Sequence, residues 1–207
     1  INSMTGNGSV FGTPSRIFIA GIPIDNVEMD EAIDAILRLC EPKGFHRVSF
    51  VNAHYFNIAC KDPHYRSLLQ RSSLCFADGI GMRLAGRLLG HPLVDNVNGT
   101  DLFPRLCKAM ARQGRRLYLL GGQPGRTEGV VRWIEQHAPG LKIAGHHHGF
   151  LSPEEEQAVL ASIRSSEPHV LLVAMGVPRQ EQWMSDHSAE LGTGVAIGVG
   201  GLFDFYS

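Results

Sequence analysis

A carboxylate stands at the end of a short apolar segment in the first half of the chain. Leu74 to Ala77 is a predicted buried strand, and Asp78 and Gly79 follow it directly. In parallel α/β sheets, ligands bind outside the carboxyl ends of the strands, so an acid there is expected to face a cleft. Asp78 is therefore a candidate general base. The alternative is that its side chain only caps the helix that begins near Ile80.

Polar residues and glycines follow the other predicted strands in the same way. Because the carboxyl ends of parallel strands meet at one edge of a sheet, we expect these residues to line one cleft. The candidate binding residues at the strand ends are Asn52, His54, Gly79, Gly121, Gly122, Gly149, Gly176, Gln180, Glu181 and Asp204. His54 is also a candidate base, although a lone histidine at a strand end is more often structural.

The segment Gly121 to Gly125 is the strongest candidate for a phosphate site. Glycine at a strand-to-helix turn lets a phosphate approach backbone N–H groups at the positive end of a helix. The alternative is that these glycines only make a tight turn. The spacing differs from the dinucleotide-binding fingerprint and from a Walker loop, and the next strand does not end in an acid for a ribose.

A metal site is not expected. His146, His147 and His148 are consecutive, and adjacent strand residues point to opposite faces, so at most two of them could share an ion. Asp78 and Asp204 could be imagined as a metal pair, but no Asp-x-Asp motif supports one.

The elements that must position these residues alternate between strands and helices. This pattern predicts an α/β fold, Rossmann-like, with a mostly parallel sheet covered by helices on both faces. Arg16 to Ala20, with Ile24 beyond Pro23, predicts a small N-terminal lobe or hairpin. Asp25 or Asn26 is the expected cap of the first helix, and Thr100 is the expected cap of a later one. A strand is expected over Leu141 to Ala144, and the helix after Glu181 is expected to run to Leu191. Residues 1–15 resemble a disordered leader or a remnant of cloning, and 16–207 are expected to form a single domain.

Composition narrows the possible partners. The 207 residues carry 19 Lys plus Arg against 20 Asp plus Glu, so the chain has no basic field that would indicate nucleic acid. Four widely spaced cysteines without a Cys-x-x-Cys pair are typical of reduced thiols in a cytoplasmic protein. No apolar run approaches the roughly 18 residues that span a bilayer, so any membrane contact is expected to be peripheral.

Several motifs occur in an order that resembles the WecG/TagA/CpsF family of glycosyltransferases. They are Val51–His54, Ala77–Gly81, Asn98–Leu102, Leu119–Gly122, Gly145–Phe150, Met175–Glu181 and Gly200–Phe205. The resemblance covers Arg16 to Ser207, and several separate motifs in one order are far more specific than any one of them.

The resemblance implies an inverting enzyme that needs no metal and no cofactor. Such enzymes move a sugar from a UDP donor to a polyprenyl-diphosphate-linked sugar during the synthesis of bacterial surface polysaccharide. By motif, Asp78 is the general base, and Asn52 and Gln180 hold sugar hydroxyls or phosphate. Backbone N–H groups near Gly121 and Gly176 would stabilise the departing UDP.

Two departures from the family pattern bear on activity. Asn96 and Asn98, in the loop before a predicted helix, are also candidate substrate-binding residues. Many relatives carry an arginine where this chain has Asn96, so an expected cationic phosphate ligand is missing. Relatives also continue beyond the Phe-Asp-Phe motif with a basic, amphipathic appendage that contacts the inner face of the cell membrane. The chain ends at Ser207, so we expect a core without that appendage, whose site a neighbouring subunit of a homo-oligomer could complete.

The donor sugar and two other functions stay open at this stage. The form of the motifs most resembles that of a branch of xanthan-type glucosyltransferases. Glucose is therefore a candidate for the transferred sugar, together with N-acetylmannosamine and its uronic acid. Asn96 and the missing appendage keep a non-catalytic nucleotide-sugar-binding protein as an alternative. A nucleotide-dependent oxidoreductase shares the expected layout, but the absent fingerprint argues against it.

Overall fold

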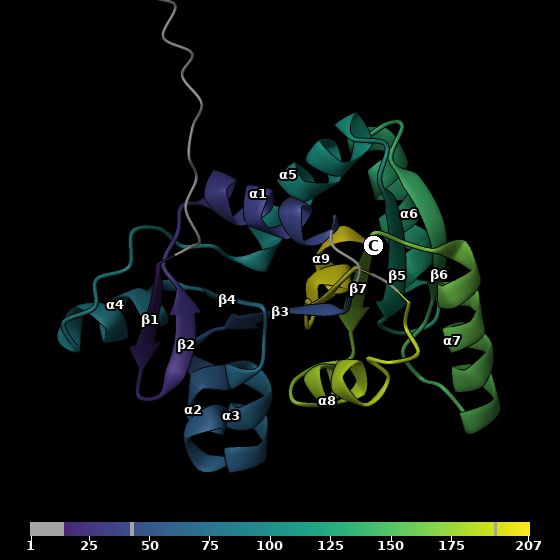
Figure 1. Ribbon diagram of the computed structural model, residues 1–207. Coiled ribbons are helices and arrows are strands. Elements are labelled where there is room, and N and C mark those ends of the chain that lie inside the picture. Colours follow the sequence, from purple (N-terminus) through teal and green to yellow (C-terminus); the bar gives the residue numbers. More distant parts are fainter. Residues whose placement is uncertain (1–14, 42–43, 193) are drawn as a thin grey trace, which may run out of the picture.

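The structure, a computed structural model, describes residues 15–41, 44–192 and 194–207. In these residues an antiparallel hairpin is followed by one six-stranded parallel sheet (Figure 1). The hairpin strands are β1 (Arg16–Ile19) and β2 (Ile22–Asp25). The sheet has the order β4 (Leu74–Ala77), β3 (His46–Val51), β8 (Val195–Gly198), β7 (Val170–Ala174), β5 (Arg116–Gly121) and β6 (Lys142–His147). The predicted leader lies outside the described residues, apart from Ser15.

Helices cover both faces of the sheet, as predicted. One face carries α1 (Met29–Leu39), α5 (Gly99–Arg112), α6 (Arg126–His137) and α9 (Leu202–Tyr206). The other carries α2 (Ala53–Lys61), α3 (Pro63–Gln70), α7 (Pro153–Ser166) and α8 (Arg179–Asp186). Helix α4 (Ile80–Leu88) extends beside the hairpin at the β4 edge (Figure 1). The α/β class with a Rossmann-like parallel sheet is therefore confirmed.

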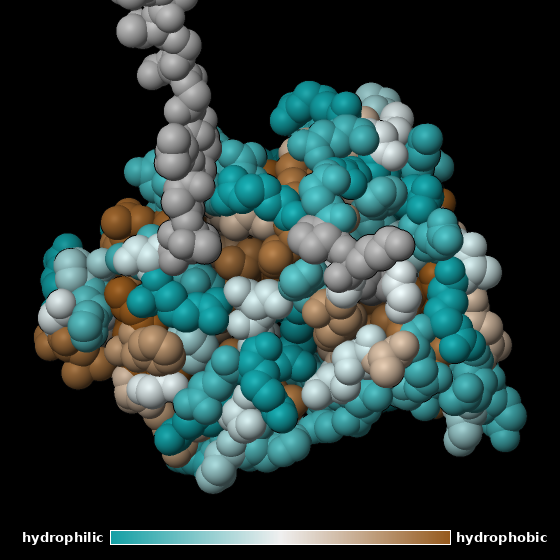
Figure 2. Space-filling model, viewed as in Figure 1, coloured by the Kyte–Doolittle hydropathy of each residue, from teal (hydrophilic) through white to brown (hydrophobic). Residues whose placement is uncertain are grey.

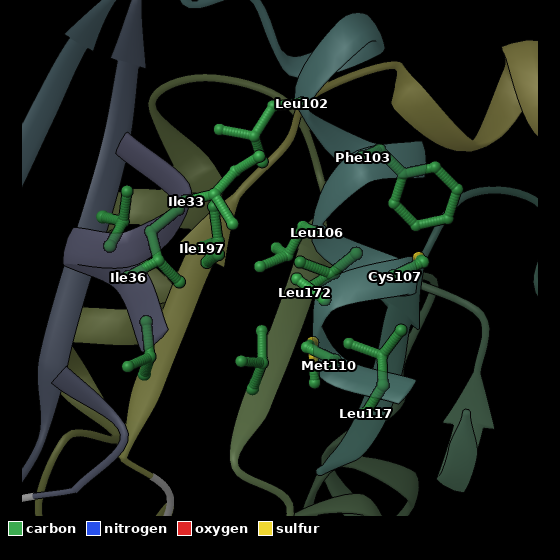
Figure 3. Close-up of a cluster of buried hydrophobic side chains, with 14 of the residues drawn as sticks. Ile33, Ile36, Leu102, Phe103, Leu106, Cys107, Met110, Leu117, Leu172 and Ile197 are labelled. Atoms are coloured by element: carbon green, nitrogen blue, oxygen red, sulfur yellow. The ribbon is translucent and has the colours of Figure 1, made fainter. Parts of the chain in front are cut away.

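The period-2 alternation of the strands divides the buried side chains between the two faces. In β5, Leu117 and Leu119 pack on the side of α1 and α5, whereas Tyr118 and Leu120 pack on the side of α7. Figure 3 shows the first of these layers, in which side chains of α1 and α5 meet those of β5, β7 and β8. Each fully buried Leu or Ile there contributes about 1.5–3 kcal/mol of transfer free energy. This packing holds the strand ends at one edge.

The hairpin attaches to the edge strand β4 through a buried acid. Asp25 is 4% exposed, and its Oδ2 accepts a hydrogen bond from the backbone N–H of Cys75 at 2.7 Å. Arg16 Nη2 lies 2.8 Å from the same oxygen. Strand β2 packs against β4, so the hairpin covers this edge of the sheet and leaves it less open to pairing with another chain. The sequence had suggested Asp25 or Asn26 as the cap of α1; instead that helix begins after Glu28, whose N–H donates to the Glu31 side chain.

Three other boundaries differ from the predictions. Helix α5 is capped by Asn98 rather than Thr100, because Asn98 Oδ1 reaches the N–H of Asp101 at 2.8 Å. Strand β6 does not stop at Ala144 but runs to His147, since Gly145 leaves room for the ring of Tyr118 and lets the strand continue. Helix α8 ends at Asp186 and not near Leu191, because the chain turns at its C-cap His187.

Candidate functional site

A hollow of about 240 Å³ opens at the carboxyl ends of β5, β7 and β8. Five glycines form much of its wall, and four of the predicted binding residues take part. The lining residues are Gly122, Gln123, Gly149, Phe150, Ala174, Met175, Gly176, Arg179, Gly200, Gly201, Phe203 and Asp204. The structure brings together four residues that the sequence placed in one cleft: Gly122, Gly149, Gly176 and Asp204. The hollow lies at the edge of the sheet where α/β proteins bind ligands.

Close packing of three chain segments explains the glycines in this wall. A Cβ on Gly121, whose φ is +135°, would lie 2.2 Å from the carbonyl oxygen of Ala174. A Cβ on Gly149 would lie 2.9 Å from the Cα of Gly121. The N–H of Gly122 donates to the oxygen of Ala174 at 2.8 Å, and the N–H of Gly149 donates to the oxygen of Gly122 at 3.0 Å. These two N–H groups are therefore already engaged within the protein.

Arg179 supplies a cation to the hollow, and the sequence analysis did not select it. It is the first residue of α8, and its Nη2 donates to the carbonyl oxygen of Gly149 at 3.3 Å. A second arginine nearby, Arg126, places its Nε 3.2 Å from Oδ1 of Asp204 and is thereby partly neutralised. A signal was present, because Arg179 stands inside the Met175–Glu181 motif beside the chosen Gln180.

Gln180 and Glu181 lie behind the hollow rather than in its wall. Gln180 is 1% exposed; its Oε1 accepts from the N–H of Gly200 at 2.9 Å, and its Nε2 donates to Glu181 Oε1 at 2.8 Å. Burial raises the pKa of Glu181 to about 7. Its other oxygen, Oε2, has no hydrogen-bond partner in the described part of the chain. The pair fixes the turn at Gly200 from beneath, and a direct contact with substrate is not available to it in this arrangement.

Asp78 is half-buried at the carboxyl end of β4. Within the described residues its carboxylate forms no hydrogen bond, and the N-cap position of α4 is taken by Gly79. The capping alternative is therefore not what the structure shows. Burial raises the pKa of Asp78 above its ordinary value, and the negative charge of Asp101 raises it further. A carboxylate with a raised pKa is a stronger base, which suits proton abstraction from a hydroxyl group.

The three asparagines near Asp78 use their side-chain oxygens to hold the backbone. Asn52 Oδ1 accepts from the N–H of Tyr55 at 2.9 Å and caps α2, as Asn98 caps α5. Asn96 Oδ1 accepts from the N–H of Gly79 at 2.6 Å. The side-chain NH₂ groups of Asn52 and Asn96 have no partner among the described residues, so they remain available to a ligand. His54 is exposed on α2, where its ring centroid lies 5.8 Å from that of Tyr55.

Tyr55 stands between the Asp78 region and the glycine-walled hollow. Burial raises the pKa of its hydroxyl, with further contributions from the negative charges of Glu181 and Asp78. A Cβ on Gly200, which lines the hollow, would lie 2.9 Å from the Tyr55 hydroxyl. Only β3 separates β4 from β8, so the ends of these two strands are roughly 10 Å apart. Asp78 does not line the hollow itself. The site therefore has two parts on one edge: a carboxylate and an anion-compatible hollow.

The histidines of β6 have protein neighbours. His146 Nδ1 lies 3.3 Å from the hydroxyl of Thr127, and His147 Nδ1 lies 3.0 Å from the carbonyl oxygen of His148. In the described residues no group of three or more His, Cys, Asp or Glu side chains is arranged to hold a metal ion. The four cysteines are free. Among the described helices, none combines the length and the apolarity needed to cross a bilayer.

The fold and the hollow define an α/β protein with a candidate ligand site at the carboxyl edge of a parallel sheet. The chain belongs to the Glycosyl transferase WecG/TagA/CpsF family, which matches residues 17–207. It is 30% identical over 190 residues to a protein of Bacillus subtilis (strain 168) named N-acetylglucosaminyldiphosphoundecaprenol N-acetyl-beta-D-mannosaminyltransferase, an alignment that covers 91% of this chain and 73% of the relative. A protein of the same name from Staphylococcus aureus (strain NCTC 8325 / PS 47) is 27% identical over 195 residues, covering 93% and 76%. The resemblance inferred from the motifs is thereby confirmed.

Proposed function

We propose that this chain transfers a hexosyl group from a UDP-sugar to a sugar carried on a polyprenyl diphosphate. The observation that carries this proposal is the position of Asp78, a half-buried carboxylate with a raised pKa, at the same sheet edge as a hollow that contains Arg179. The names of the relatives favour N-acetylmannosamine as the transferred sugar and N-acetylglucosaminyl diphosphoundecaprenol as the acceptor. Glucose is the second candidate, since the motifs around Asn98 and Phe203 resemble those of glucosyltransferases.

The acceptor reacts at the β4 end of the site. The Asp78 carboxylate takes the proton of the acceptor hydroxyl as the hydroxyl oxygen forms a bond to the anomeric carbon of the donor. The bond between that carbon and the diphosphate oxygen breaks, and its electron pair leaves with UDP. Attack from the side opposite the leaving group inverts the anomeric centre. We assign the orientation of sugar hydroxyls near Asp78 to the NH₂ groups of Asn52 and Asn96, which have no partner among the described residues.

The leaving diphosphate is held at the other end of the site. The N–H groups of Gly122, Gly149 and Gly200 already donate within the protein, so they are poor candidates for the developing charge. We assign that role to the guanidinium of Arg179, supported by the positive end of α8. Gln180 and Glu181 act as positioning residues, because they hold Gly200 from beneath. The residues of the proposed site extend from Asn52 to Gly200, so we treat 16–207 as one catalytic domain.

Replacing Asp78 with Asn tests the proposal. The amide keeps the size of the side chain but cannot accept a proton, so turnover should fall by roughly 100-fold or more. UDP binding by titration calorimetry should stay within about twofold of wild type, because Arg179 and the glycine wall are intact. Turnover that survives the substitution would refute the base assignment. UDP binding by the wild-type chain with neither transfer nor donor hydrolysis would instead favour the nucleotide-sugar-binding alternative.

A thermal-shift panel addresses the donor. UDP, UDP-glucose, UDP-N-acetylmannosamine, GDP-mannose and NAD are compared at equal concentrations, and a ligand that binds the native state raises the melting temperature. We expect UDP-N-acetylmannosamine to raise it most. A shift with NAD and not with UDP would contradict the proposed class of reaction.

A further inference from the structure

Helix α4 presents a row of large apolar side chains to solvent. Ile80 is 84% exposed, Leu84 58% and Leu88 76%, and the next residue, Leu89, is 55% exposed. Residues four apart on a helix lie on the same face, so the first three form one continuous stripe. Figure 2 shows apolar surface at the side of the molecule where α4 projects. Exposed apolar stripes of this kind on an otherwise packed domain mark interaction sites.

A hollow of about 290 Å³ lies along this stripe and is flanked by positive charge. Its lining residues are Ile80, Arg83, Leu84, Arg87, Pro92 and Leu93. From Gly79 to Val94 the sequence contains these two arginines and no Asp or Glu. The next acid, Asp95, is already engaged, because its carboxylate accepts from the N–H groups of Met29 and Asn96 at 3.0 and 2.7 Å. Neither guanidinium forms an ion pair or a hydrogen bond within the described part of the chain. The surface is therefore both apolar and cationic.

We propose that the face of α4 formed by Ile80, Arg83, Leu84, Arg87 and Leu88 docks on the surface of a bilayer that contains anionic phospholipids. An interfacial helix inserts its apolar side chains at the boundary of headgroups and acyl chains, and its arginines contact phosphate groups. A second copy of this chain is a less suitable occupant, because a symmetric contact would bring Arg83 and Arg87 against their own equivalents.

The position of α4 in the fold relates this surface to the proposed reaction. The helix begins at Ile80, two residues after Asp78, so docking α4 on a bilayer brings the β4 end of the site to the level of the headgroups. This step rests on the proposed function, in which the acceptor sugar is attached to a membrane lipid through a diphosphate. In that arrangement the diphosphate stays at the surface and the acceptor hydroxyl reaches Asp78.

Vesicle flotation tests the docking surface without donor or acceptor present, so its result does not depend on catalysis. The full chain is mixed with vesicles of phosphatidylcholine alone or with 30% phosphatidylglycerol, a composition of roughly the surface charge of a cytoplasmic leaflet. We expect binding to the anionic vesicles and about tenfold less to the neutral ones. The double variants Leu84→Gln/Leu88→Gln and Arg83→Gln/Arg87→Gln should each weaken binding by about tenfold. Asp78→Asn should bind as wild type does.

Matched controls separate a specific surface from general apolarity or charge. Phe205→Gln removes a side chain that is 75% exposed on α9, and Arg112→Gln/Arg132→Gln removes two exposed arginines from α5 and α6. Both controls should float as wild type does. Circular dichroism checks that each variant is folded.

Three results would overturn the proposal. The first is that wild type does not bind anionic vesicles, or that the α4 variants bind as well as the controls. The second is a dimer in analytical ultracentrifugation that dissociates in the α4 variants, which would make the face a contact between copies. The third is faster hydrogen exchange of α4 after removal of residues 1–14 without vesicles, which would show that the chain covers this face itself. Turnover and vesicle binding test the two proposals separately. If Asp78→Asn loses turnover and still binds vesicles, both the base assignment and the docking surface are supported.

Discussion

The side-chain oxygen of Asn96 accepts a hydrogen bond from the backbone N–H of Gly79 at 2.6 Å, and so ties the loop before α5 to the residue after the proposed base. Gly79 has a φ of +89°, a conformation that side chains rarely adopt, and this turn directs the chain from β4 into α4. The family resemblance had placed a cation at position 96. In this chain the residue instead sets the position of the Asp78–Gly79 turn.

Replacing Asn96 with Ala should therefore act on the turn rather than on donor binding. Without the acceptor the Gly79 N–H loses its partner and the Asp78 carboxylate is less well placed. We expect kcat to fall about 10- to 100-fold, the loss typical of a misplacement of about 1 Å, with little change in the Kd for UDP. Steady-state kinetics and calorimetry measure both. Asn57→Ala, on the exposed side of α2, is the matched control and should have no effect.

Asp101 should control the pH dependence of the reaction. Its negative charge contributes to the raised pKa of Asp78, so Asp101→Asn lowers that pKa. The acid limb of the kcat/KM profile then moves to lower pH, since the base stays ionised further into acid. Asp34→Asn, exposed on α1, should leave the profile in place. An unchanged acid limb in Asp101→Asn would mean that another group controls it.

Glu181 should make the folded state less stable as pH rises. Its folded pKa is raised by burial from 4.5 to about 7, so the native state holds the proton more tightly than the unfolded state. The stability this gives is fully present below pH 4.5 and is lost as the pH rises to about 7. Glu181→Gln removes the titration and keeps an acceptor for Gln180. Urea unfolding at pH 8 should show the variant more stable than wild type by about 2–3 kcal/mol, with a smaller difference near pH 5.

Gly149 should tolerate no side chain. A Cβ there would lie 2.9 Å from the Cα of Gly121, and neither backbone segment can move easily because each belongs to the wall of the hollow. Gly149→Ala should destabilise the fold by about 1–3 kcal/mol and weaken UDP binding. Gly99 is the matched control, because a Cβ there meets no atom within 4 Å and its φ is unstrained. Gly99→Ala should be neutral or slightly stabilising. Thermal unfolding of both variants and of wild type measures the difference in stability.

Local sequence determined the class of fold and the place of the candidate base. The alternation of apolar runs with helical periodicity identified the strands and helices, and the rule that ligands gather at carboxyl ends selected Asp78 and the glycines of the hollow. The boundaries near Thr100, Ala144 and Leu191 were wrong, because caps and strand ends depend on contacts with other segments. Asn98 was chosen as a ligand, and the structure shows it capping α5.

Tertiary structure alone decided which of these residues meet. Strand β8 comes last in the chain yet pairs between β3 and β7, and this brings Gly200 beside Tyr55 and places Gln180 beneath it. Periodicity describes one element at a time and carries no information on which strand pairs with which. The side-chain oxygens of Asn52, Asn96 and Asn98 likewise accept hydrogen bonds from backbone N–H groups. The contact between Asn96 and Gly79 forms only when the chain has folded, because the two residues are far apart in sequence. The exposure of α4 has the same origin, because an amphipathic stripe is apolar in sequence whether or not another element covers it.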